Sequence, residues 1–142
     1  MKQHFIIIVS LCITTLLSAQ HSVIGKWKTI DDETGKAIAI IEIFEKSDKI
    51  YGKVLEILNA KDRNRTCEKC LANDKGKPIL GLTVIKGLKK DGNEYNNGKI
   101  LDPKSGKIYK CYINLEDNDK LKVRGFIGIS LFGRTQYWHR IK

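Results

Sequence analysis

The sequence lacks the motifs of the common enzyme classes. It has no Ser-His-Asp order, no paired-carboxylate motif and no glycine-rich phosphate loop. It also lacks a nucleic-acid-binding motif, an internal repeat and a low-complexity stretch. We therefore expect no catalytic residue, no cofactor and no nucleic-acid partner. Enzyme activity is unsupported by the residues rather than excluded by them.

Long apolar runs are also scarce, because only residues 5–17 form one. A short basic start with Lys2 precedes this run, and Ser18 and Ala19 follow it. This order predicts a secretory signal peptide over residues 1–19, cleaved after Ala19, so that residues 20–142 form one mature domain in the periplasm or outside the cell. No second run is long enough to span a bilayer, which predicts a mature chain without a transmembrane segment.

Positive charge dominates the composition. The formal net charge is +10, and it becomes +9 when Lys2 is removed with the signal peptide. A basic surface can attract nucleic acid, anionic lipid or acidic glycans, and export makes nucleic acid a poor candidate. The alternative is an ordinary solvated, lysine-rich surface.

The mature chain has an odd number of cysteines, namely Cys67, Cys70 and Cys111. In an oxidising compartment the spacing of Cys67 and Cys70 favours a disulfide, with Cys111 a buried free thiol. Two alternatives stay open for this CxxC pair. Nearby basic residues could stabilise a reactive thiolate, or the pair could bind zinc with Cys111 and His139 as distant further ligands.

Apolar residues alternate with a period of two along most of the chain. Residues 38–44, 51–57, 109–115 and 121–126 are typical of half-buried strands, and turn signals separate them. We predict an all-β fold, a single antiparallel up-and-down barrel of about eight strands between Ile24 and Ile141, because closure removes exposed edges. Residues 59–78 break the period and are predicted to form a long surface loop.

Two resemblances support this fold. Gly25, Trp27 and the late Arg140 resemble the lipocalin and wider calycin pattern, in which the arginine covers the indole at the barrel end. Further segments make the chain resemble the domain-of-unknown-function family 2147, which consists of small exported bacterial proteins. These segments are residues 78–82, 97–103, 105–107, 109, 121–128 and 132–138.

The resemblance to family 2147 implies a lipocalin-like barrel and no particular activity. Many members of that family have a cysteine pair between the two arginines of the C-terminal block. Here the span between Arg124 and Arg134 contains Phe126, Phe132 and Gly133 but no cysteine. A redox role that rests on that pair therefore does not transfer to this chain.

Candidate binding residues lie in the same C-terminal block. A regular strand places Phe132, Arg134, Gln136, Trp138 and Arg140 on one face. The row of Arg134, Gln136 and Trp138 would line a pocket for an anionic or planar ligand, with Arg124 on a neighbouring strand facing the same space. Trp27 is a further candidate ligand-binding residue. In the alternative interpretation, the arginines pair with Asp102, Glu42 or Glu56 and brace a filled barrel.

Three functions remain open on the sequence alone. The first is binding of a small apolar or anionic molecule in the barrel mouth, or of an envelope component on the basic face. The second is a thiol-redox or metal-binding module that uses Cys67 and Cys70. The third is a structural envelope protein without a ligand.

Overall fold

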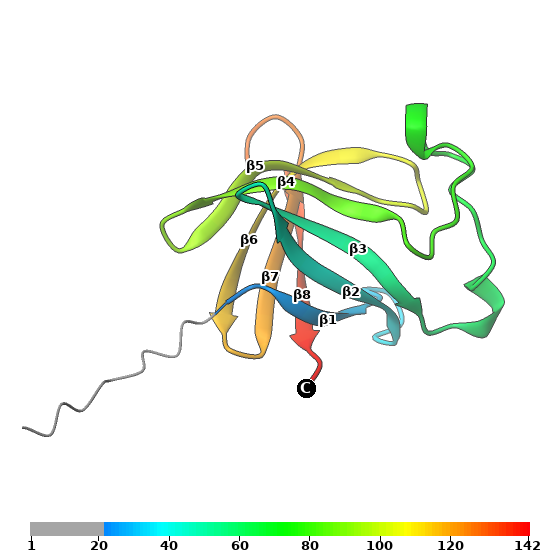
Figure 1. Ribbon diagram of the computed structural model, residues 1–142, viewed down its shortest axis with the longest axis horizontal. Coiled ribbons are helices and arrows are strands. Elements are labelled where there is room, and N and C mark those ends of the chain that lie inside the picture. The colour runs from blue at the N-terminus through cyan, green and yellow to red at the C-terminus, as the bar shows by residue number, and fades with distance from the viewer. Residues whose placement is uncertain (1–21) are drawn as a thin grey trace, which may run out of the picture.

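A computed structural model describes residues 22–142, so the expected signal peptide and its cleavage site lie outside the described residues. Eight antiparallel strands form a closed barrel in sequence order, as Figure 1 shows. Their bounds are β1 Gly25–Ile30, β2 Ala37–Lys46, β3 Lys49–Ile57, β4 Thr83–Asp91, β5 Glu94–Leu101, β6 Ile108–Asp117, β7 Lys120–Phe126 and β8 Gly133–Arg140.

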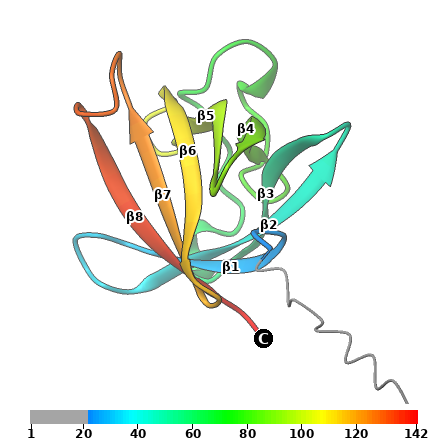
Figure 2. The same cartoon turned by 90° about the vertical axis from the view of Figure 1, so that its left-hand side faces the viewer.

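The barrel closes between its first and last strands. Trp27 of β1 is opposite Arg140 of β8, and Lys28 is opposite His139. Figure 2 shows β6, β7 and β8 side by side in one wall, with β1 running across the end of β8. The predicted all-β barrel of about eight strands is confirmed.

The connections alternate between the two ends of the barrel because every neighbouring pair of strands is antiparallel. Residues 31–36, 58–82, 102–107 and 127–132 therefore connect strands at one end, which we call the loop end. The turns at residues 47–48, 92–93 and 118–119 lie at the opposite end, together with the start of β1. We call this the turn end.

Apolar side chains fill the interior of the barrel. Their alternation along each strand directs one set inward, and those side chains form a single cluster with both tryptophans. Trp27, Ile85, Leu88, Ile113 and Leu121 are fully buried in it. A ligand would therefore bind at the loop end or on the outer wall of the barrel, and not deep in its interior.

Cys111 lies within this interior. It is buried and unpaired, and its inward neighbour along β6 is Ile113. Burial raises the pKa of the Cys111 thiol to about 12, because the apolar surroundings disfavour the thiolate. The predicted buried free thiol is thus present, and it is neutral at physiological pH.

The connection between β3 and β4 is more ordered than the predicted surface loop. It contains two short 3₁₀ helices, η1 Ala60–Asp62 and η2 Ala72–Asp74, and a bridge between Thr66 and Pro78. Residues 78–82 complete this connection, and β4 begins at Thr83. None of the helices among residues 22–142 has the length and apolarity of a membrane span.

This connection folds back over the outer wall of the barrel. The pairing of Ile85 with Ile100 places their neighbours Val84 and Leu101 on the outer face, yet both are buried. They belong to the same cluster as Cys67, whose sulfur lies 3.5 Å from the carbonyl oxygen of Pro103. The loop therefore covers apolar side chains of β4 and β5.

An ion pair fixes the part of the same loop that contains η2. Asp74 of η2 pairs with Lys86 of β4, and Lys77 lies 3.7 Å from the same carboxylate. The hydrogen bond from Lys86 lowers the pKa of Asp74 below its ordinary value. This pair and the disulfide together hold the loop against the outer wall.

Candidate functional site

The predicted row on β8 runs along the inner face toward the loop end. Trp138, Gln136 and Arg134 are opposite Leu121, Val123 and Gly125 of β7, respectively. Trp138 is buried, whereas the side chain of Arg134 is 71% exposed. The row therefore begins in the core and ends at the rim of the barrel.

A carboxylate from another loop completes the row. The Trp138 indole Nε1 donates to Gln136 Oε1 at 3.2 Å, and Gln136 Nε2 donates to Asp32 Oδ2 at 3.2 Å. The same oxygen lies 3.3 Å from Arg134 Nε. Asp32 belongs to the β1–β2 loop, and its side chain is 44% exposed. We call Asp32, Arg134, Gln136 and Trp138 the rim site.

The observed ion pair differs from the predicted bracing interaction. Arg134 pairs with Asp32, and not with Asp102, Glu42 or Glu56. Asp102 instead accepts hydrogen bonds within its own turn. Because the Arg134–Asp32 pair is exposed to water, it is worth at most about 1 kcal/mol of stability.

Arg124 does not belong to the rim site, and the expectation that it faces the same space is wrong. It is opposite Thr135, whose side chain lies on the outer face, one residue out of phase with Arg134. Its Nη1 donates to Thr135 Oγ1 at 2.8 Å, and its Nε donates to the carbonyl oxygen of Ser130 at 2.8 Å. Arg124 thus braces the β7–β8 loop from outside.

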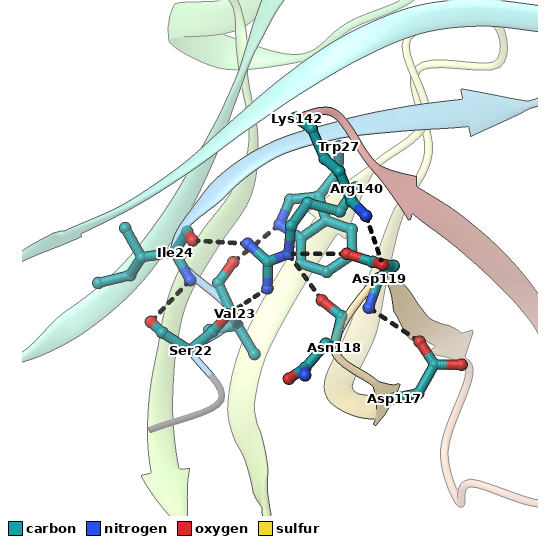
Figure 3. Close-up of polar contacts among 9 residues, drawn as sticks. All are labelled: Ser22, Val23, Ile24, Trp27, Asp117, Asn118, Asp119, Arg140 and Lys142. Carbon is teal, nitrogen blue, oxygen red and sulfur yellow. Dashed lines mark hydrogen bonds and ion pairs between the residues drawn. The ribbon is translucent and has the colours of Figure 1, made fainter. Parts of the chain in front are cut away.

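Trp27 lies at the turn end, opposite Arg140 and so at the other end of β8 from Arg134. Its indole is fully buried and donates to the carbonyl oxygen of Val23 at 2.8 Å. The Arg140 guanidinium covers the ring at 4.2 Å from its centre, which confirms the predicted pairing of these two residues. Figure 3 shows the guanidinium above the indole.

Each of the three guanidinium nitrogens of Arg140 donates to a backbone carbonyl oxygen. Arg140 donates to Asn118 at 2.7 Å, to Ile24 at 3.1 Å and to Ser22 at 2.6 Å, as Figure 3 shows. Trp27 is therefore covered, and every nitrogen of Arg140 already bonds to the chain itself. Neither residue is placed to contact a ligand at the loop end.

The CxxC pair forms a buried disulfide between Cys67 and Cys70. Thiol exchange requires an attacking thiolate to reach one of the sulfurs, and the folded loop prevents that approach. Cys111, a further ligand in the zinc alternative, lies inside the barrel, on β6. Among residues 22–142, no cluster of three metal-binding side chains is found.

A separate groove of about 580 Å³ lies on the outer wall at the bulge of β5. Asn96, Lys110, Tyr112 and Phe126 line it, and the two aromatic rings lie 6.2 Å apart. Within the described chain, the buried Asn96 Oδ1 has no hydrogen-bond partner. This groove is distinct from the rim site, and no pattern in the sequence predicts it.

Asp32 is the rim residue that the sequence did not lead us to predict. The signal was nevertheless present. In a closed up-and-down barrel the β1–β2 loop and the start of β8 lie at the same end, on neighbouring strands. A carboxylate in that loop is therefore the natural partner for a cation at the start of β8.

Comparison with solved structures shows the same fold. Protein HP1028 from the human pathogen Helicobacter pylori, described as belonging to the lipocalin family, superposes with a TM-score of 0.75. The two chains share 18% sequence identity over 85% of this chain and 84% of that one. A comparison with curated proteins found no match.

The family profile that matches this sequence extends over residues 25–140, from the first strand of the barrel to the last. It is described as an uncharacterized protein conserved in bacteria. The match includes the whole barrel, the disulfide loop and the rim site. The chain therefore belongs to the DUF2147 family.

Proposed function

We propose that this protein is an exported binding protein whose rim site holds a small anionic or planar molecule. The supporting observation is the position of Arg134, which extends from the inner face of β8 at the loop end and is 71% exposed. Its only ion-pair partner among residues 22–142 is the half-exposed Asp32. An incoming anion can replace that carboxylate at little cost, because exposed ion pairs are weak.

The neighbouring groups suit a ligand that is both planar and charged. Gln136 presents an amide that already bridges Asp32 and Trp138, so it can donate to a ligand oxygen in place of the carboxylate. The guanidinium of Arg134 can bind a carboxylate or phosphate through two parallel hydrogen bonds. Lipocalin-like folds commonly bind small molecules at the barrel mouth, which supports the proposal by analogy only.

The alternative functions have less support. The disulfide is buried, which opposes a thiol-exchange role for Cys67 and Cys70. A purely structural role agrees with the filled interior, but it does not explain why an arginine extends from the inner face to the rim. We therefore place binding first.

Removing the rim cation should weaken ligand binding while leaving the fold intact. For Arg134→Ala we expect several-fold weaker binding of the anionic aromatic probe anilinonaphthalene sulfonate, and loss of any small molecule retained by the protein purified from its own cells. The free energy of unfolding should change by less than about 1 kcal/mol, because the Arg134–Asp32 pair is exposed. Fluorescence titration, native mass spectrometry and denaturant melts measure the three quantities.

Arg65→Ala is a matched control for Arg134→Ala. Arg65 lies 3.3 Å from Asp62 in a similarly exposed ion pair, but on the β3–β4 loop. Its substitution should leave probe binding unchanged. Equal losses in both variants would show that net charge, and not the rim site, determines binding, and the proposed site would then be abandoned.

Export is the second part of the proposal, supported by the apolar run of residues 5–17 and by Ser18 and Ala19. We expect the protein recovered from the periplasmic or culture fraction to begin at Gln20. N-terminal sequencing of that fraction tests this expectation. Recovery of the protein only from the cytoplasm, with residues 1–19 still attached, would contradict it.

A further inference from the structure

The β7–β8 loop at the loop end exposes a group of large apolar side chains. The exposed fractions are 67% for Ile127, 60% for Ile129, 76% for Leu131 and 68% for Phe132. In Figure 1 this orange loop projects from the top of the barrel, and it does so again in Figure 2. Clustered apolar exposure of this kind marks an interaction surface, because water disfavours it.

The loop has a defined conformation that keeps these side chains outward. The Ile127 N–H donates to the Phe132 carbonyl oxygen at 3.0 Å, which closes the loop at its base. From the outer wall, Arg124 Nε donates to the carbonyl oxygen of Ser130 at 2.8 Å. Lys110 Nζ donates to the carbonyl oxygen of Gly128 at 3.2 Å. Two cations thus hold the backbone of an apolar loop.

Positive charge predominates next to this loop. Arg124 of β7 and Arg134 of β8 flank it, and the carboxylate of Asp32 pairs with Arg134. Lys107 and Lys110 of the adjacent β6 region are also exposed. An apolar tip above a base of cations is complementary to a lipid leaflet with anionic headgroups. The apolar side chains enter the boundary of the acyl region, and the cations meet the phosphates.

We propose that residues 127–132 insert into the surface of an anionic lipid leaflet and dock the barrel there by its loop end. Ile129 and Leu131 enter the leaflet, while Lys110 and Arg124 remain at the level of the headgroups. This docking does not require a ligand in the rim site. It assigns a specific partner to the basic surface and a role to the most exposed apolar segment.

Vesicle sedimentation tests the proposal, and the protein is used in the form in which cells produce it. We expect the protein to bind vesicles made of equal parts phosphatidylglycerol and phosphatidylcholine, to bind pure phosphatidylcholine much more weakly, and to dissociate as salt is added. The double variant Ile129→Ser, Leu131→Ser should bind the anionic vesicles at least about tenfold more weakly. Both positions are exposed, so thermal melts should show an unchanged fold.

Leu71→Ser is the matched control. Leu71 is 72% exposed but lies beside η2, on the β3–β4 loop. Its substitution should leave vesicle binding unchanged. All the proteins compared have the same N-terminus, so any contribution from residues outside the barrel cancels.

Three results would overturn the proposal. The first is equal vesicle binding by the parent and the double variant. The second is equal binding of the parent to anionic and neutral vesicles. The third is a lipid-free dimer of the parent that the double variant fails to form, because the loop would then be an interface between two copies of this chain.

Discussion

Replacing Trp27 with alanine should lower the free energy of unfolding by about 3–5 kcal/mol, a large share of a typical domain's stability. The indole is fully buried at the turn end, and it donates to the Val23 carbonyl oxygen. The Arg140 guanidinium lies on its face. The substitution therefore removes packing, a hydrogen bond and the surface that positions the arginine. Chemical denaturation measures the loss.

Two further variants separate these contributions. Trp27→Phe keeps an aromatic face under Arg140 but loses the indole donor, so the Val23 carbonyl oxygen loses its partner. We expect a smaller loss, about 1–2 kcal/mol. Tyr137→Ala removes a half-exposed ring from the outer wall and should cost less than about 1 kcal/mol. A Trp27→Ala variant as stable as Tyr137→Ala would show that the turn end does not depend on this packing.

Replacing Gly106 with alanine should destabilise the loop end by at least about 3 kcal/mol. Gly106 has φ +71°, which alanine adopts only with strain. An added Cβ would also overlap the backbone carbonyl of Lys69 in the disulfide loop. Since backbone atoms cannot rotate away, the two loops must separate. Denaturant melts measure the loss, and reduction of the Cys67–Cys70 disulfide by dithiothreitol should become faster as the loop opens.

Gly92→Ala separates the strain of the positive φ from the overlap. Gly92 lies in the β4–β5 turn with φ +61°, and an added Cβ there has no neighbour within 4 Å. We expect a loss of about 1–2 kcal/mol and no change in the rate of disulfide reduction. Equal effects of the two glycine substitutions would contradict the close contact between the 102–107 turn and the disulfide loop.

The period of two along the chain is sufficient to predict most of the fold. Alternation along residues 38–44 and 109–115 predicts strands, and β2 and β6 are found there. The pairing of Trp27 with Arg140, which the resemblance to the lipocalin pattern implies, is present. These features are local, or they depend on barrel closure alone, so the sequence is sufficient for them.

The candidate site depends on contacts that periodicity does not describe. Alternation correctly places Arg134, Gln136 and Trp138 in one row. Alternation does not predict the register between two neighbouring strands. A register shift of one residue would turn every side chain of a strand to the opposite face of the sheet. For this reason the prediction put Arg124 on the wrong side of the wall.

The sequence by itself determined the barrel topology and the row on β8. It also predicts the compartment, and that remains a prediction. Only the tertiary structure decided that Asp32 is the partner of Arg134, that the disulfide loop covers Val84 and Leu101, and that residues 127–132 project with their apolar side chains exposed. The physical reason is common to all three. Each depends on how a loop folds against a distant strand, and loops have no repeating pattern from which their packing can be predicted.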